Sequence, residues 1–118
     1  MMYKQGEIVL IPVPFSNLSS SKKRPVMILS NNQYNTSTDD VIVMAVTSNV
    51  RGMSSEILFD TSDMTHGKIP KPSCIRSDKV YTLSKEIIVK KYGEISEVKV
   101  IEAKNKLFEL LSDANRNE

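Results

Sequence analysis

An arginine and two hydroxyl residues stand at the ends of two apolar segments of this sequence. Arg24 and Pro25 open the apolar segment 26–29, and Thr47 and Ser48 directly follow the apolar segment 41–46. Proline has no N–H and a fixed φ, so it is tolerated at the start of a strand better than in its interior. A guanidinium offers a rigid fork of donors that fits phosphate oxygens, and a hydroxyl can hold a phosphate or a ribose 2′-OH. The rim where these two strands end is therefore the candidate site.

Other kinds of chemistry have weaker support in the sequence. The four glycines stand far apart and form no phosphate-binding loop. His66 and Cys74 are the only imidazole and thiol, too few for a zinc site within one chain, and a Cys–His nucleophile pair would lack a third orienting residue. A site made of carboxylates alone remains open, but the aspartates at 39, 40, 60 and 63 are typical turn formers. We expect no metal and no cofactor, and we expect Cys74 to be a small core residue.

The elements that must position the rim are short strands at regular spacing. We expect strands at 7–13, 26–29, 41–46, 55–60, 73–76, 80–83 and 86–90, with 55–60 forming a hairpin with the strand before it. Polar segments at 15–23, 31–40 and 61–72 are expected to be loops or connections. This pattern predicts a small antiparallel barrel or sandwich whose sheet closes on itself.

The C-terminal part differs in kind, because its apolar residues recur at helical spacing. Ser96 is expected to cap a helix, with Ile95 and Val100 as a hydrophobic staple and Glu102 and Lys106 as an i,i+4 pair. One face of this helix carries Val100, Ala103, Leu107, Leu110 and Leu111, so it is expected to cover the sheet, while the polar segment 112–118 is expected to fray.

Length and composition limit the classes of protein that fit. With 118 residues, 40% hydrophobic and 25% charged, the chain is expected to form one domain, 1–118. The formal net charge of +2 permits a local contact with an anionic partner but is far from that of a histone-like binder. One cysteine and no secretory leader favour the cytoplasm, and no apolar run approaches the roughly 20 residues of a membrane span.

Several blocks along the chain resemble one family in their order and spacing. They are Gly-Glu-Ile-Val-Leu at 6–10, Lys-Arg-Pro-Val at 23–26, Ser-Asn at 30–31, Val-Thr-Ser at 46–48 and, more loosely, Ile-Arg-Ser-Asp-Lys at 75–79. Together these blocks resemble the MazF/PemK family of bacterial toxin ribonucleases. The resemblance implies a mainly β fold with an SH3-like antiparallel barrel and a C-terminal helix, shared with CcdB-like gyrase poisons.

The resemblance also implies a function and a set of site residues. The chain is expected to be a sequence-specific, metal-independent endoribonuclease, the toxin of a type II toxin-antitoxin system, with Arg24 and Thr47 as the catalytic pair. Attack by the substrate's 2′-OH would give a 2′,3′-cyclic phosphate and a 5′-hydroxyl. The implied partners are single-stranded RNA, a cognate antitoxin through which the complex would bind DNA, and a second copy in a homodimer. Further expected RNA contacts come from Ser48, Lys22, Lys23, Arg51 and Arg76, and from Phe15 or Tyr34 by stacking on an unpaired base.

Three alternatives stay open from the sequence. Arg76 could equally form a salt bridge with Asp78. The chain could be a gyrase-poison-like toxin that binds a protein target, or an inactive barrel that only binds RNA. The serine-rich segment between Phe15 and Lys23 departs from many relatives, which leaves the RNA sequence preference open.

Overall fold

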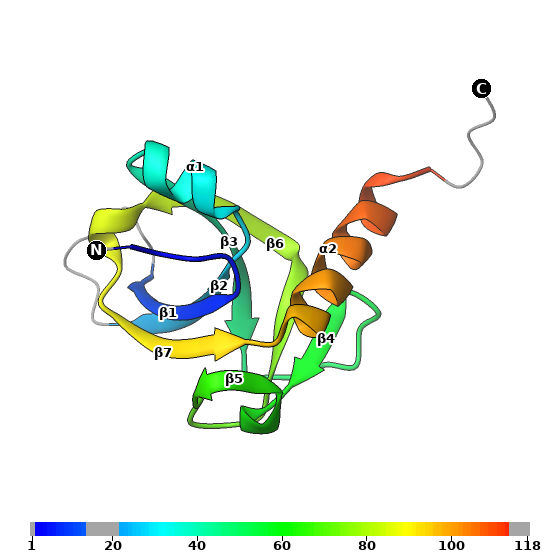
Figure 1. Cartoon of the computed structure of the whole chain (residues 1–118). Coiled ribbons are helices and arrows are strands. Elements are labelled where there is room, and N and C mark those ends of the chain that lie inside the picture. The colour runs from blue at the N-terminus through cyan, green and yellow to red at the C-terminus, as the bar shows by residue number, and fades with distance from the viewer. Residues whose placement is uncertain (1, 14–21, 114–118) are drawn as a thin grey trace.

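The three central strands of the protein are buried on both faces, as their continuous apolar sequence predicts. They are β1 (Glu7–Pro12), β2 (Lys23–Ile28) and β3 (Asp40–Thr47) in a computed structural model that describes residues 2–13 and 22–113. The other strands are β4 (Glu56–Phe59), β5 (Met64–Gly67), β6 (Ser73–Ser84) and β7 (Lys90–Ile95). All strand pairings among the described residues are antiparallel, and the strand order is β4-β6-β3-β2-β1-β7-β5 (Figure 1).

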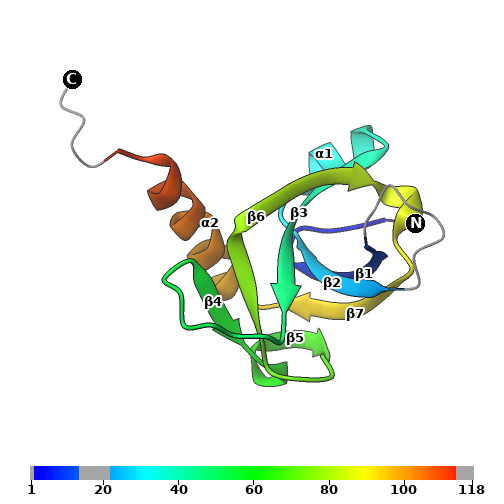
Figure 2. The same ribbon diagram turned by 180° about the vertical axis from the view of Figure 1, so that it is seen from behind.

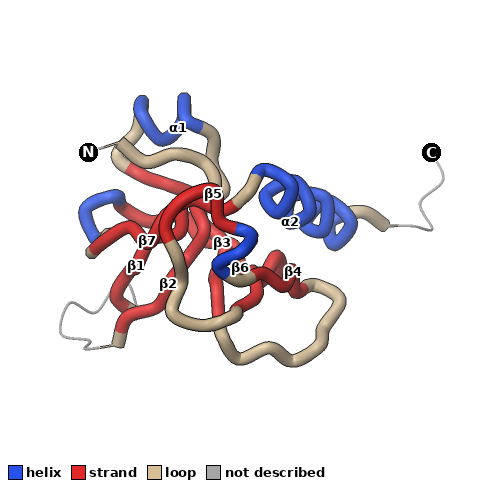
Figure 3. Tube along the Cα trace, turned by 60° about the horizontal axis from the view of Figure 1, so that its bottom comes forward, coloured by secondary structure: helices blue, strands red, loops and turns tan. Residues whose placement is uncertain are grey.

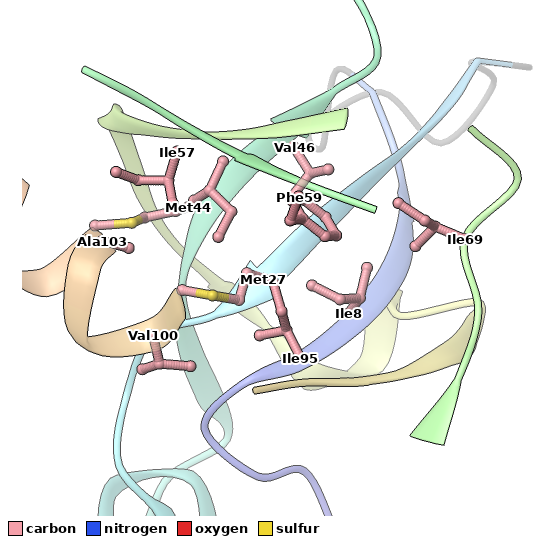
Figure 4. Close-up of a cluster of buried hydrophobic side chains, with 11 residues drawn as sticks. Ile8, Met27, Met44, Val46, Ile57, Phe59, Ile69, Ile95, Val100 and Ala103 are labelled. Atoms are coloured by element: carbon pink, nitrogen blue, oxygen red, sulfur yellow. The ribbon is translucent and has the colours of Figure 1, made fainter. Parts of the chain in front are cut away.

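Successive side chains of the central strands alternate between two apolar clusters. One cluster lies between the sheet and the helix α2 (Glu97–Leu111), where Figure 4 shows Val100 and Ala103 facing Met27 and Met44. The other lies on the opposite face and is formed by Val9, Ile11, Val26, Ile28, Val41, Val43 and Leu83. Together the two clusters fix which side chains of β2 and β3 face which side of the sheet.

The sheet is a half-barrel with a C-terminal helix, which confirms the predicted fold. The expected full closure does not occur: β4 and β5 form the two edges of the hydrogen-bonded sheet, and the views from front and back show a strongly curved sheet (Figures 1 and 2). The predicted hairpin of 55–60 with the preceding strand is also wrong, because β4 pairs with β6, which lies between β3 and β4. The two strands expected at 73–76 and 80–83 are one long strand, β6.

Three further segments differ from their predicted structure, the first two through side-chain caps and the third partly through pairing with a distant strand. The 31–40 segment contains α1 (Asn32–Ser37), because Asn31 Oδ1 accepts the N–H of Tyr34 and caps a helix. The expected strand at 86–90 starts instead in a 3₁₀ turn, η2 (Lys85–Ile87), capped by the Ser84 hydroxyl, and β7 begins only at Lys90. The 61–72 connection contains a second 3₁₀ turn, η1 (Thr61–Asp63), and the strand β5.

Strand β5 can pair with β7 because two glycines face each other across the pair. Gly67 lies opposite Gly93, and a Cβ added at Gly67 would lie 2.2 Å from the carbonyl oxygen of Tyr92. Only glycine permits this close approach of two backbones. The polar composition of 61–72 is typical of a connection, so it does not predict this strand.

The helix α2 begins where the sequence predicts, but its second half is packed only through Leu107. The Ser96 hydroxyl accepts the N–H of Lys99, and Val100 and Ala103 are buried against the sheet. The second half extends beyond the sheet, and Phe108 and Leu111 are 73% and 76% exposed (Figures 1 and 3). The predicted pair of Glu102 with Lys106 is replaced by i,i+3 pairs, Lys99–Glu102 and Lys106–Glu109. Among the described residues, no helix is long and apolar enough to cross a membrane.

Candidate functional site

A cavity of about 350 Å³ opens where β2 begins and β3 ends, at the predicted rim. We call it the rim cavity. Its wall includes Ile11 and Val26, from the apolar cluster on the face of the sheet opposite α2. The rest of the wall includes polar and basic side chains from β2, β3, β6 and the loop after β3. These side chains are Arg24, Thr47, Asn49, Arg51, Arg76, Lys79 and Tyr81. The structure therefore brings Arg24, Thr47 and Arg76, which lie far apart in the sequence, to one hollow.

Pro25 explains why the cavity lies between Arg24 and Thr47. The β2–β3 ladder ends at the pair Val26–Ala45. The next rung would need Pro25, which has no N–H to donate. Strand β1 still pairs with β2 as far as Lys23, so β2 stays in the sheet on its other side. Arg24 and Thr47 thus stand at the ends of the two strands, beyond their last shared rung.

Arg24 and Thr47 differ in how firmly they are held. Arg24 is exposed, and within the described residues it forms no ion pair with a carboxylate, so its guanidinium is available to an anionic ligand. Thr47 is half-buried, and its hydroxyl oxygen accepts the N–H of Asn49 at 3.0 Å. This bond fixes the Thr47 rotamer and leaves the hydroxyl proton free to be donated toward the cavity.

Arg76 forms the salt bridge with Asp78 that the sequence left as an alternative. Arg76 Nε and Nη2 donate to the two carboxylate oxygens of Asp78 at 2.9 and 2.8 Å. Hydrogen bonding to Arg76 lowers the pKa of the Asp78 carboxyl, so the pair is charged at neutral pH. Arg76 still lines the rim cavity, and the ion pair holds its guanidinium in place there.

A bulge in β6 directs Arg76 and Lys79 to the cavity. Ala45 pairs with Arg76 but its neighbour Met44 pairs with Val80, so three residues of β6, 77–79, have no partner on β3. The buried Ser77 anchors the bulge, because its hydroxyl donates to the carbonyl of Ser55 at 2.6 Å. Bulges commonly re-aim side chains next to functional sites. The sequence pattern predicts a break between 76 and 80 and contains no sign that the strand continues through it.

Sequence reasoning missed Glu56, which shapes the loop that carries Arg51. The Glu56 carboxylate accepts the N–H groups of Arg51, Gly52 and Met53 at 2.8 to 3.2 Å. Burial raises the pKa of this carboxyl, but the three backbone hydrogen bonds and nearby Arg76 outweigh it, so the net pKa lies below its usual value. Gly52, with φ of +77°, supplies the turn. In the sequence, the sign of this loop is Gly52 with the acidic Glu56 four positions later.

A second, smaller cavity of about 190 Å³ adjoins the first and contains Ser48. It shares Arg24 and Thr47 with the rim cavity, and its other polar residues are Lys23, Ser48, Lys71, Ser73 and Tyr92. Lys23 and Ser48 therefore lie beside the candidate pair, as expected. Arg24 and Thr47 form the boundary between the two cavities.

The remaining predicted site residues lie elsewhere. Lys22 lines neither cavity, and Phe15 falls outside the described residues. Tyr34 lies in α1 and lines neither cavity, so within residues 2–13 and 22–113 the aromatic residues that line the two cavities are Tyr81 and Tyr92.

The imidazole and the thiol lie outside the cavities and apart from each other. His66 contacts Glu94 at 3.1 Å on β7, and Cys74 is buried as expected, with burial raising the pKa of its thiol to about 11. Within residues 2–13 and 22–113, no three side chains of His, Cys, Asp and Glu gather in a group that could hold a metal ion.

Comparisons with known proteins match this fold over nearly its whole length. A family model described as the PemK-like, MazF-like toxin of type II toxin-antitoxin systems matches residues 4–111. A solved mycobacterial endoribonuclease in complex with its cognate antitoxin is similar with a TM-score of 0.74 and 22% identity, over 92% of this chain and 94% of that chain. MazE-MazF from Deinococcus radiodurans gives 0.75 and 19%, over 97% and 99%.

The Mycobacterium tuberculosis toxin MazF-mt6 is similar in the same way. Its TM-score is 0.72 and its identity 20%, over 89% of this chain and 95% of that chain. A search of curated protein sequences gives no match. Because the identities of these structures lie below 25%, their likeness concerns the fold.

Proposed function

Because the chain belongs to the PemK-like, MazF-like toxin family of type II toxin-antitoxin systems, we propose that it is a sequence-specific endoribonuclease that cleaves single-stranded RNA without a metal ion. One observation carries the proposal: an arginine without an ion-pair partner among the described residues shares a cavity with an oriented threonine hydroxyl. Two solved mycobacterial proteins of the same fold are endoribonucleases, which supports the same reaction class.

The two residues have distinct roles in the proposed reaction. The 2′ oxygen of the substrate attacks the adjacent phosphorus and loses its proton, while the bond to the 5′ oxygen breaks and that oxygen gains a proton. Negative charge grows on the phosphoryl oxygens during this step, and the Arg24 guanidinium stabilises it. The Thr47 hydroxyl, oriented by the N–H of Asn49, positions the phosphate or the ribose. The products are a 2′,3′-cyclic phosphate and a 5′-hydroxyl.

The other basic residues of the rim cavity position the RNA backbone. Arg51 and Lys79 are exposed, and Arg76 is held by Asp78. A guanidinium already paired with a carboxylate contributes less charge to a phosphate than an unpaired one. We therefore assign Arg24 the chemical role and Arg76 a positioning role, and Tyr81 offers a ring at the same wall.

The proposed partner protein is a cognate antitoxin. The mycobacterial endoribonuclease and the Deinococcus MazF were each solved with such a partner. A segment that folds on binding covers a large surface and pays its ordering entropy at that moment. We propose that such a segment covers Arg24 in the rim cavity, and that the complex, rather than the toxin alone, binds DNA. The toxin would act in the cytoplasm, where messenger RNA is accessible.

We also propose a homodimer. Helix α2 exposes Phe108, Leu110 and Leu111 in its second half and Val98 in its first turn, and exposed apolar patches of this kind mark interaction surfaces. Twofold pairing is the commonest way to bury such a surface. Light scattering at tens of micromolar should give twice the mass of the chain, and a monomer at that concentration would contradict the dimer.

The experiment that tests the proposed activity compares the purified protein with its Arg24→Ala variant on a mixture of cellular RNA. Mapping of the new RNA ends should reveal cuts at one short sequence with the parent and none with the variant. RNA that stays intact with the parent, while the protein arrests growth, would favour a toxin that binds a protein target. RNA that is bound but never cut would identify an inactive RNA-binding module.

A further inference from the structure

A third cavity continues the site away from the rim. It measures about 500 Å³ and lies over β7 and the connection between β5 and β6, where it is lined by Lys68, Ile69, Pro70, Lys90, Lys91 and Tyr92. It shares Pro70 and Tyr92 with the second cavity, which in turn shares Arg24 and Thr47 with the rim cavity. The three hollows therefore adjoin one another, and together we call them the groove; the candidate pair lies between the first two.

The charges of the chain are strongly segregated toward this groove. Four of its 16 lysines and arginines line the rim cavity, the second cavity adds Lys23 and Lys71, and the third adds Lys68, Lys90 and Lys91. None of the aspartates and glutamates among residues 2–13 and 22–113 lines any of the three; Asp78 adjoins the groove through its pair with Arg76. Although the net charge of the chain is only +2, its basic side chains thus form a track of the kind that follows a nucleic-acid backbone.

Two of the three lysines in the third cavity are available to phosphates. Lys91 is held by the carboxylate of Glu7 at 3.2 Å and by the carbonyl of Met2 at 2.7 Å. Lys68 and Lys90 are exposed, and neither forms an ion pair with any described carboxylate. The structure therefore separates one structural lysine from two that can pair with a ligand.

Tyr92 supplies an aromatic surface at the same place. It is half-buried and packs against the apolar cluster that lies between the sheet and α2. The ammonium of Lys90 lies 4.9 Å from the centre of its ring. An exposed cation–π contact is weaker than the stacking of a base on an aromatic ring, so an unpaired base can take the place of the ammonium. Lys90 is then within reach of the phosphate that belongs to that base.

We propose that the third cavity is a nucleotide subsite, in which Tyr92 stacks an unpaired base and Lys68 and Lys90 bind phosphates on one side of the scissile bond. This inference rests on the proposed RNA substrate. It assigns residues far from Arg24 in the groove to affinity for longer strands and gives them no part in the chemical step.

Binding of a strand that cannot be cut separates this proposal from the proposed activity. The probe is fluorescein-labelled oligodeoxyuridylate of about 12 nucleotides, which carries phosphates and bases but no 2′-OH, measured by anisotropy over a range of salt concentrations. Tyr92→Leu should bind about tenfold more weakly, and Tyr92→Phe, which keeps the ring, should bind like the parent. The double variant Lys68→Ala/Lys90→Ala should lower the slope of log K against log salt by about 1.4, because each phosphate contact on a single strand contributes about 0.7.

The matched control is Lys104→Ala/Lys106→Ala, which removes the same charge from α2, outside the three cavities. It should leave the slope unchanged. If the Lys68/Lys90 variant keeps the parent's slope, or if the control loses as much, the subsite is wrong. The lysine arm decides the question even if Tyr92→Leu fails to fold, because both lysines are exposed. A parent that binds the probe through Tyr92 and these lysines but cuts no RNA would instead overturn the proposed activity and leave the subsite standing.

Discussion

Polar side chains at the two ends of the β2–β3 pair have opposite environments. Just after β2, Ser30 and Asn35 form a closed network: the Ser30 hydroxyl donates to Asn35 Oδ1 and accepts the N–H of Ile42 at 2.9 Å. Asn35 Nδ2 donates to the carbonyls of Tyr3 and Ser30 at 3.2 and 3.0 Å, and both side chains are buried. At the other end, Arg24 is exposed and forms no ion pair within the described residues.

This difference separates polar groups that hold the fold from those that can serve a ligand. A buried polar group that is fully hydrogen-bonded stabilises one arrangement of the chain, and its loss leaves partners unsatisfied. A charged group left open at a cavity contributes little to folding and much to binding. Arg76 lies between these cases, because it faces the cavity while Asp78 satisfies it. The comparison predicts which substitutions change activity and which change stability.

The largest expected effect is on catalysis at the open end. Arg24→Ala should lower the rate of RNA cleavage by at least about a hundredfold, since losing a donor to a developing oxyanion costs about 3 to 4 kcal/mol. Its free energy of unfolding should change by less than about 0.5 kcal/mol, because the side chain is exposed. Single-turnover rates and urea unfolding measure the two quantities. A folded variant that still cuts RNA would show that Arg24 has no role in the reaction. One that melts far below the parent would show that Arg24 holds the fold.

The converse effect is expected at the closed end. Asn35→Ala should lower the free energy of unfolding by about 1 to 3 kcal/mol, because the Ser30 hydroxyl and two carbonyls lose a buried partner. Cleavage per folded molecule should stay at the parent's value. Gln33→Ala, at an exposed position of the same helix, is the control and should have little effect on either quantity. Equal stability of the two variants would show that the network does not hold the fold.

A smaller effect on activity is expected at Thr47. Thr47→Val keeps the branched shape that suits a strand but removes the hydroxyl, so cleavage should fall by about tenfold, the order of one net hydrogen bond. Thr82→Val, at an exposed position of β6, is the matched control for loss of a hydroxyl from a strand. If both variants cut RNA at the parent's rate, Thr47 does not position the substrate.

The smallest effect concerns the carboxylate that holds the Arg51 loop. The pKa of Glu56 is lowered in the folded protein, so its ionised form stabilises the fold above the pKa of the unfolded chain, and this contribution is lost as the pH falls through the folded pKa. The parent should therefore be more stable than Glu56→Gln at neutral pH, and the difference should shrink below about pH 4.5. Urea unfolding of both proteins between pH 7 and pH 3 measures it. A difference that grows toward acid pH would reverse the assigned sign.

The sequence predicted the rim well because its signals are local. Pro25 marks a strand start by its missing N–H, and the abrupt change from Val46 to Thr47 marks a strand end, so Arg24 and Thr47 are positioned by their immediate neighbours. The same holds for the helix cap at Ser96, which depends on residues within one turn. Such features need no knowledge of distant pairing.

The parts that the sequence did not predict depend on pairing between distant residues or on side chains that change the local structure. The bulge at Ser77 requires the carbonyl of Ser55, and β5 requires Gly67 to meet Gly93. Asn31 turns a polar segment into a helix, although its composition is that of a loop. The groove beyond Ser48 joins Lys68 and Tyr92, which come from different elements with no shared sequence signal. The roles of Arg24 and Thr47 remain predictions from the family resemblance and the cavity they share.

One measurement tests the central claim most directly: the chemistry of the RNA ends that the purified protein produces in the presence of EDTA. An RNA containing the mapped cleavage sequence is compared with the same RNA carrying a single 2′-deoxyribose at the cut. We predict that the first is cut as well with EDTA as without it, leaving a 2′,3′-cyclic phosphate and a 5′-hydroxyl, and that the second is bound but stays whole. Cleavage of the deoxy substrate, or cleavage that stops when magnesium is removed, would contradict the account of Arg24 acting on an attack by the substrate's own 2′-OH.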